Sequence, residues 1–189
     1  GYPVRSIFSI PFMGLNEEGL PTFRDQDGNI SVSDVYFQER DHTDFLEYSG
    51  SADPTDIGSL GNTFSYKNFR LNLFVTYSFG NVIRLDPVFK KKYTDLSAMP
   101  KEYRNRWVVP GDEKYTDIPR LTDERHTPQG LYYHNGGAAT IGDDIFEFYN
   151  NSDLRVVSGN FVRCRSISLA YYVPNSILKH IYLKGASLS

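Results

Sequence analysis

Histidines and paired carboxylates are the residue types in this chain that could carry out acid–base catalysis. Neither a metalloprotease HExxH motif nor a nucleophile elbow is present. The acidic pairs at residues 17 to 18 and 143 to 144 are adjacent, so in an extended segment their side chains point apart and cannot share a proton transfer. The histidines lie far apart along the chain: His42, His126, His134 and His180. The sequence therefore predicts no enzyme activity.

The opening spacing of a calcium-binding loop occurs at Asp25, Asp27 and Asn29. The twelfth position of that loop is Tyr36, where calcium loops carry a bidentate glutamate. An Asx turn, in which the aspartate accepts backbone N–H groups, is therefore favoured over calcium binding. The single cysteine, Cys164, has no histidine or cysteine nearby at zinc spacing. We expect neither a metal nor another cofactor.

Aromatic and amide side chains are the residue types that could capture and release a solute. Aromatic rings cover the apolar faces of a sugar or peptide, and amides pair with its polar groups. The long central segment carries such a set: Trp107, Tyr132, Tyr133, His134 and Asn135. These residues are the predicted solute-binding set, with aromatic packing inside a large loop as the alternative.

The composition indicates a mainly β protein. Aromatic residues make up 15% of the 189 residues, and 15 glycines and 10 prolines supply many turns. The formal net charge of −3 and the scattered basic residues argue against nucleic-acid binding, and the run at residues 90 to 92 is typical of a solvated loop. No run of about eighteen apolar residues exists, so a transmembrane helix is not expected.

Residues 69 to 79 predict a strand with two chemically different sides. Arg70, Asn72 and Thr76 fall on one parity, and the other parity is apolar with aromatic residues at both ends. Eleven residues at roughly 3.3 Å each span about 35 Å, enough to cross the hydrocarbon core of a membrane when tilted. We therefore expect Arg70, Asn72 and Thr76 to face a lumen and Leu71, Leu73 and Val75 to face lipid.

Other alternating or apolar runs predict further strands at residues 4 to 12, 58 to 66, 160 to 173 and 180 to 189. The short link at residues 67 to 68 predicts a hairpin, and Pro174-Asn175 predicts a second turn. In the strand from residue 160, Ile167 and Leu169 lie on the side that is expected to face lipid.

Long and short connections alternate between these strands. Residues 13 to 57 and 80 to 159 are expected to form long loops, with short helical elements at residues 99 to 107 and 143 to 149. An outer-membrane barrel sorts its connections in this way, with short periplasmic turns and long extracellular loops. The asymmetry therefore favours a barrel over a soluble meander.

Arg163 and Arg165 are the exception to this pattern. In a regular strand every second residue before Tyr171 lies on the side expected to face lipid. Both arginines fall on that side, where a charged side chain is costly. Two explanations are open: the arginines lie at the level of the outer headgroups, or a β-bulge near Cys164 switches the parity and turns them inward.

Several blocks of residues occur in a characteristic order and spacing, and together they cover most of the chain. The blocks are Gly1-Tyr2-Pro3-Val4, Asn62-Thr63-Phe64-Ser65-Tyr66, Thr76-Tyr77-Ser78-Phe79-Gly80, Arg106-Trp107, Pro110-Gly111-Asp112, Thr116-Asp117-Ile118-Pro119-Arg120, Ser158-Gly159-Asn160-Phe161 and Ser166-Ile167-Ser168-Leu169. In order and spacing they resemble the last third of the barrel in the SusC/RagA group of TonB-dependent outer-membrane transporters.

This resemblance implies an all-β fold: about five antiparallel strands of a 22-stranded, plugged transmembrane β-barrel with two long extracellular loops. In that barrel Arg70 and Asn72 would line the lumen wall or touch the plug, and contact with the plug or with water is favoured over contact with a solute. It implies that residues 1 to 189 are a partial barrel domain, and that the plug domain, the energy-coupling box and the closing strands have no counterpart here. The parent protein would lie in the bacterial outer membrane. It would import oligosaccharides or peptides with a SusD-like surface lipoprotein, using energy from the TonB complex.

A secreted β-sandwich that binds carbohydrate is the competing class. It would also be rich in aromatic residues and nearly free of cysteine. A sandwich must cover one side of each sheet with a second sheet, whereas a barrel segment leaves an apolar side exposed.

Overall fold

The structure is a computed structural model, and it describes residues 1–25, 27–32, 46–90, 92–94, 98–122, 129–134, 138–174, 178 and 186–188. The chain divides into two compact units. The first, termed the loop unit, contains Gly1–Ala52 and Val82–Val157, and the second, termed the strand unit, contains Asp53–Asn81 and Ser158–Ser189.

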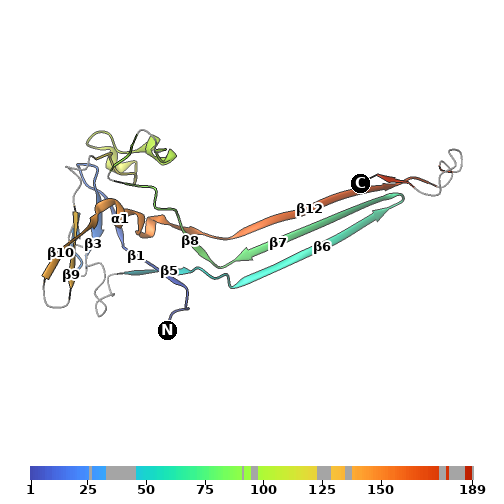
Figure 1. Ribbon diagram of the computed structural model, residues 1–189, viewed down its shortest axis with the longest axis horizontal. Coiled ribbons are helices and arrows are strands. Elements are labelled where there is room, and N and C mark those ends of the chain that lie inside the picture. The colour runs from blue at the N-terminus through green and yellow to red at the C-terminus, as the bar shows by residue number, and fades with distance from the viewer. Residues whose placement is uncertain are drawn as a thin grey trace. The chain divides into compact units, whose positions relative to one another are not determined.

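The strand unit is an antiparallel sheet with the order β13-β12-β7-β6. Its strands are β6 (Asp56–Tyr66), β7 (Phe69–Phe79), β12 (Phe161–Tyr172) and β13 (Ser187–Leu188). Figure 1 shows β6, β7 and β12 as three long strands lying side by side. The expected all-β architecture is confirmed, and so are the hairpin of β6 with β7 and the long strand that begins near residue 160.

A two-residue turn at Lys67 and Asn68 fixes the hairpin register. Lys67 adopts a left-handed conformation with φ of 51°, as hairpin turns whose twist matches that of the strands require. The Asn68 side chain also donates to the Tyr172 carbonyl of β12 at 2.7 Å. The turn is thereby tied to the third long strand.

The pairing of β12 with β7 contains one irregularity, between Cys164 and Ser166. Cys164 pairs with Val75 and Ser166 pairs with Phe74, so Arg165 is an extra residue without an opposite partner. This is a β-bulge. Because of it, odd-numbered residues of β12 lie on one face of the sheet before the bulge and on the other face after it. The bulge that one of the two explanations required is therefore present, and it moves Arg163 to the face opposite Ile167 and Leu169, whereas Arg165 is the extra residue itself.

The loop unit is built from short strands and small helices. Its strands are β1 (Ser6–Ser9), β2 (Phe12–Leu15), β3 (Pro21–Arg24), β4 (Ile30–Ser31), β5 (Glu47–Ser51), β8 (Val82–Arg84), β9 (Gln129–His134), β10 (Ala138–Asp144) and β11 (Val156–Ser158, which ends just inside the strand unit). Its helices are η1 (Lys101–Asn105), η2 (Asp112–Lys114), α1 (Ile145–Asn150) and η3 (Asp153–Arg155). No helix in the described part of the chain is long and apolar enough to cross a membrane.

The core of the loop unit is mainly aromatic. The rings of Phe23 and Phe148 meet edge to face with centroids 6.0 Å apart, and those of Phe89 and Tyr149 do so at 4.8 Å. Both phenylalanines at positions 23 and 148 are fully buried, as is Tyr149. Short α1 carries three of these core aromatic residues, Phe146, Phe148 and Tyr149.

Several expected boundaries were wrong. The single strand over residues 4 to 12 is two strands, because Pro11 has no N–H group for a ladder, and Ile10 makes an isolated bridge with Ser152. The expected loops contain β2 to β5 and β8 to β11; all of these except β9 and β10 have five residues or fewer, which leaves little room for alternation. The expected helices are the brief η1 and α1. Residues 175 to 177 and 180 to 185 lie outside the described part, so the turn at Asn175 and most of the last expected strand fall there.

Candidate functional site

The strand unit presents two faces of different chemistry. Residues that pair directly in an antiparallel sheet share a face, and the face alternates along each strand. The polar face is formed by Ile57, Ser59, Gly61, Thr63, Ser65, Arg70, Asn72, Phe74, Thr76, Ser78, Phe161, Arg163, Ser166, Ser168, Ala170 and Tyr172. The apolar face is formed by Asp56, Gly58, Leu60, Asn62, Phe64, Tyr66, Phe69, Leu71, Leu73, Val75, Tyr77, Phe79, Val162, Cys164, Ile167, Leu169 and Tyr171, with Asp56 at its end.

A row of polar side chains crosses the polar face from strand to strand. The Thr63 hydroxyl donates to Asn72 Oδ1 at 2.8 Å, and Asn72 Nδ2 donates to the Ser168 hydroxyl at 3.1 Å. The three residues come from β6, β7 and β12, so the row links all three long strands. Sequence analysis found Asn72 but missed Thr63 and Ser168, because their place beside Asn72 depends on the strand register.

Two arginines lie on the polar face, each beside an aromatic ring. The Arg70 guanidinium carbon lies 5.4 Å from the Tyr172 ring centroid, and that of Arg163 lies 5.0 Å from the Phe161 centroid. Such cation–π contacts hold the flat guanidinium groups against the sheet. No carboxylate among the described residues forms an ion pair with either arginine.

Two glycines on β6 make room for rings on β7. A Cβ atom on Gly58 would lie 2.4 Å from the Tyr77 hydroxyl oxygen and 2.6 Å from Tyr77 Cζ. Tyr77 therefore lies directly over this backbone on the apolar face. On the polar face, a Cβ on Gly61 would approach the Phe74 ring at 3.4 Å. Each ring covers backbone that a glycine leaves bare, which stabilises the pairing of β6 with β7.

Much of the apolar face is open. Leu60 is 64% exposed, Ile167 is 68% exposed and Leu169 is 55% exposed. No second sheet covers this face among the residues that the structure describes. A soluble protein rarely leaves so continuous an apolar surface uncovered.

Trp107, from the predicted solute-binding set, lies packed within the loop unit. It is 9% exposed, and its ring lies so close to Gly19 that a Cβ there would come within 2.3 Å of it. Gly19 has φ of +74°, and its carbonyl accepts the Arg120 N–H at 2.9 Å. This position matches the packing alternative given for Trp107.

The remaining members of that set are in or next to β9, which contains Tyr132, Tyr133 and His134 and pairs antiparallel with β10. Asn135 lies outside the described residues.

Among the described residues no group of three or more histidine, cysteine or acidic residues could hold a metal ion. At the expected Asx turn, Asp25 Oδ1 accepts the N–H groups of Asp27 and Asn29 at 2.9 and 2.8 Å, which confirms that turn.

Glu113 organises the loop around Trp107. Its carboxylate accepts the indole N–H of Trp107 at 3.2 Å and the backbone N–H of Gly111 at 2.7 Å. Hydrogen bonds from backbone N–H groups, first its own and then that of Gly111, and then from Trp107, lower the pKa of the Glu113 carboxyl. The neighbouring Asp112 accepts the N–H groups of Val108 and Val109, both at 3.0 Å.

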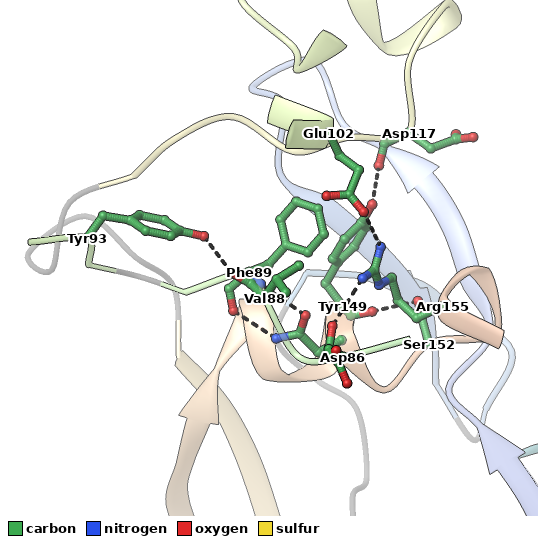
Figure 2. A network of polar contacts seen from close by, with 10 residues as sticks. Asp86, Val88, Phe89, Tyr93, Glu102, Asp117, Tyr149, Ser152 and Arg155 are labelled. Carbon is green, nitrogen blue, oxygen red and sulfur yellow. Dashed lines mark hydrogen bonds and ion pairs between the residues drawn. The ribbon is translucent and has the colours of Figure 1, made fainter. Parts of the chain in front are cut away.

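A buried arginine joins the segments of the loop unit (Figure 2). Arg155 is 5% exposed. Its guanidinium donates to the Asp86 carbonyl at 3.1 Å and approaches the Glu102 carboxylate at 3.5 Å. The guanidinium carbon also lies 5.0 Å from the Phe89 ring centroid. Nearby, the Tyr149 hydroxyl donates to the Asp117 carbonyl at 3.0 Å. Burial raises the pKa of Tyr149 and of Tyr103, so both phenols stay protonated well above the usual range.

Asn150 completes this network by pairing with the backbone of Phe89. Its Nδ2 donates to the Phe89 carbonyl at 2.8 Å, and its Oδ1 accepts the Phe89 N–H at 3.3 Å. Arg84 makes a similar link elsewhere, donating to the Phe8 carbonyl at 2.7 Å and to Ser9 Oγ at 3.0 Å. Burial lowers the pKa of the Arg84 guanidinium. These contacts are structural, and they hold the loop unit in one arrangement.

No family model matches the chain, and no curated protein matches it significantly. Solved structures do match. A chain in the RagAB peptide importer in its closed-closed state is 20% identical, with a TM-score of 0.56, over 95% of this chain and 18% of that chain. A chain in the RagAB peptide transporter is 17% identical, with a TM-score of 0.60, over 96% of this chain and 18% of that chain.

A chain in the open-open state of the RagAB peptide importer gives a TM-score of 0.54 at 16% identity, over 95% of this chain and 17% of that chain. The present chain thus spans less than a fifth of the chains that it matches. The resemblance to the SusC/RagA group that the sequence blocks indicated is confirmed at the level of the fold. The chain has the all-β fold of one segment of the chains in these RagAB structures.

Proposed function

We propose that this chain is a segment of a TonB-dependent outer-membrane transporter of the SusC/RagA type, and that the whole protein imports peptides or oligosaccharides. The observation that carries the proposal is a sheet of three long antiparallel strands with one polar face and one exposed apolar face. The fold shared with chains of the RagAB peptide transporter supports it.

The strand lengths suit a membrane crossing. Strands β6 and β7 have eleven residues each and β12 has twelve, which matches the nine to eleven or so that a tilted transmembrane strand needs. In this proposal Leu71, Leu73, Val75, Ile167 and Leu169 face lipid, and Arg70, Asn72 and Thr76 face the lumen. A lipid-facing role explains why apolar side chains on that face remain exposed.

The free edge of β6 also supports a barrel. Within the described residues β6 pairs only with β7, so its other edge carries backbone N–H and C=O groups without a neighbouring strand. In a barrel the next strand of the parent protein would pair there. A soluble β-sandwich, the alternative class, would instead need a second sheet over the apolar face.

The loop unit would lie outside the cell, because the chain enters and leaves it at the Asp53, Asn81 and Ser158 ends of the long strands. There, Tyr132, Tyr133, His134 and Asn135 are the proposed solute-contacting residues, whereas Trp107 packs against Gly19 and bonds to Glu113. A SusD-like surface lipoprotein would meet the parent on the same side. The TonB complex would act through a part of the parent beyond these residues.

Uptake and membrane assembly of the full-length protein test this function. We expect it to fractionate with outer membranes, to run as a heat-modifiable band on gels, and to take up labelled peptides or oligosaccharides in a manner abolished by a protonophore. A strain lacking the gene is the matched control. Recovery as a soluble protein without detergent, together with unchanged uptake in the deletion strain, would contradict the proposal.

A further inference from the structure

The polar face of the strand unit carries positive charge without a compensating carboxylate. The only acidic residue in β6, β7 and β12 is Asp56, and Asp56 pairs with Phe79 of the apolar face. Arg70 and Arg163 both lie on the polar face. Any charged molecule that binds this face therefore meets cations alone among the residues of the three long strands.

Each guanidinium is held in place while its N–H groups stay available. The Tyr172 and Phe161 rings support the two groups by their faces, at 5.4 and 5.0 Å. Neither arginine donates a side-chain hydrogen bond to another described residue. A guanidinium fixed in this way offers its planar N–H edge to a carboxylate, which it can bind through two parallel hydrogen bonds.

The bulge at Arg165 sets the distance between the two cations. It brings Arg163 opposite Thr76, six positions along β7 from Arg70. Six positions on a strand correspond to about 20 Å. An extended peptide has the same rise per residue, so carboxylates six residues apart on it would have the same spacing.

The surface between the arginines suits an extended peptide. The row of Thr63, Asn72 and Ser168 offers hydroxyl and amide groups, and Phe74, which is 41% exposed, offers an apolar contact. Side chains of these kinds pair with the polar and apolar groups of a peptide.

We propose that the polar face binds an acidic peptide in extended form, with Arg70 and Arg163 each pairing with one carboxylate. The inference rests on the proposed function, because it places this face along the solute path. It names the substrate class as anionic peptides, with acidic side chains about six residues apart.

The test compares two peptides in the full-length transporter. One carries aspartates six residues apart, and the other carries asparagines at the same positions. The variants are Arg70→Gln, Arg163→Gln and their combination, with Lys67→Gln as the matched control, because Lys67 lies in the turn and not on the polar face. The readouts are uptake in cells and the Kd measured on detergent-purified protein.

We expect each arginine variant to weaken binding of the aspartate peptide about tenfold, as loss of one charge-assisted pair predicts, and to leave the asparagine peptide unchanged. Lys67→Gln should change neither. Equal effects on both peptides, no effect, or the same effect from Lys67→Gln would overturn the inference. The inference would also be overturned if the arginine variants were less stable without ligand and bound both peptides equally weakly. That result would mean that the arginines contact acidic groups elsewhere in the parent. If the unaltered transporter neither binds nor takes up the aspartate peptide, the inference is overturned. Uptake of other peptides or of oligosaccharides would then still support the proposed function.

Discussion

Arg163 lies directly across from Thr76 on the polar face of the sheet, and the extra residue Arg165 puts it there. With regular alternation from Tyr171, Arg163 would occupy the apolar face. The bulge therefore lets one strand carry an apolar stripe through Ile167 and Leu169 and still turn a charge to the other side. The remaining pairs on both sides of the bulge are regular.

Removing the bulge should leave both faces intact. Deletion of Arg165 would join Cys164, which pairs with Val75, to Ser166, which pairs with Phe74, so regular pairing would result without a change of face. Deletion of Ala170 should be harmful, because it shifts neighbouring residues to the opposite face or unpairs the strand end. We expect the Arg165 deletion to keep the folded, heat-modifiable band of the full-length protein in outer membranes and the Ala170 deletion to lose it. Equal yields for the two deletions would contradict this register.

Charge on the two faces should have unequal costs. Ile167 pairs with Leu73 on the apolar face, whereas its neighbour Ser168 pairs with Asn72 on the polar face. An arginine facing lipid near the bilayer midplane costs about 2–4 kcal/mol. Ile167→Arg should therefore lower the denaturant midpoint of the folded transporter in lipid vesicles, and Ser168→Arg should change it much less. Similar losses from both substitutions would show that the apolar face does not meet lipid.

The sequence predicted the long strands well because their signals are local. Alternation over residues 69 to 79, broken only at Phe74, and a two-residue link set both ends of β7 as the structure has them. The bulge was one of two open explanations, because a misplaced arginine signals a parity conflict without saying how it is resolved. The faces of Thr63 and Ser168 depend on partners in other strands, and single-strand patterns do not contain that register.

The loop unit was predicted less well because its order comes from distant contacts. Strand β1 pairs with β5 some forty residues later, and β8 pairs with β11 across more than seventy residues. Each of these strands is five residues or shorter, so alternation has no room to appear. The buried pairing of Asn150 with Phe89 has no sequence signal, because asparagine is equally common in exposed turns.

Cysteine labelling should report which parts reach the cell exterior. In a Cys164→Ser background, Tyr115→Cys introduces a thiol at a site that is 88% exposed in the loop unit, and Lys67→Cys introduces one in the exposed hairpin turn. A membrane-impermeant maleimide should label position 115 on intact cells and position 67 only after lysis. In the unaltered protein, Cys164 shares the apolar face with Val75 and should resist the reagent before and after lysis. The reverse pattern for positions 115 and 67 would invert the proposed topology.

Asn150 should matter more to the loop unit than its neighbour Asn151. Asn150→Leu removes both side-chain bonds to the buried Phe89 backbone, and each buried group left unsatisfied costs about 1–3 kcal/mol. Asn151 donates from its side chain to the Glu147 carbonyl at an exposed site, so Asn151→Leu should have a small effect. Limited proteolysis of the full-length protein measures this difference. We expect faster cleavage between residues 82 and 157 only in the Asn150 variant, and equal cleavage of the two variants would argue against the buried pairing.

Acid should loosen the loop around Trp107 through Glu113. The pKa of this carboxyl is lowered in the folded protein, so its contribution to stability is present above the ordinary carboxyl range and is lost as the pH falls through the lowered value. The emission of Trp107, obtained as the difference between the full-length protein and its Trp107→Phe variant, should be constant from pH 7 to about pH 5 and should shift at lower pH, where ordinary carboxyl groups and then Glu113 become protonated. Glu113→Gln should already show altered emission at neutral pH, because an amide cannot accept both N–H groups as strongly as a carboxylate. Asp117→Asn is the matched control, since the structure uses the carbonyl of Asp117 and not its carboxylate in the contact with Tyr149. An acid shift that persists unchanged in Glu113→Gln would mean that another group controls the Trp107 environment.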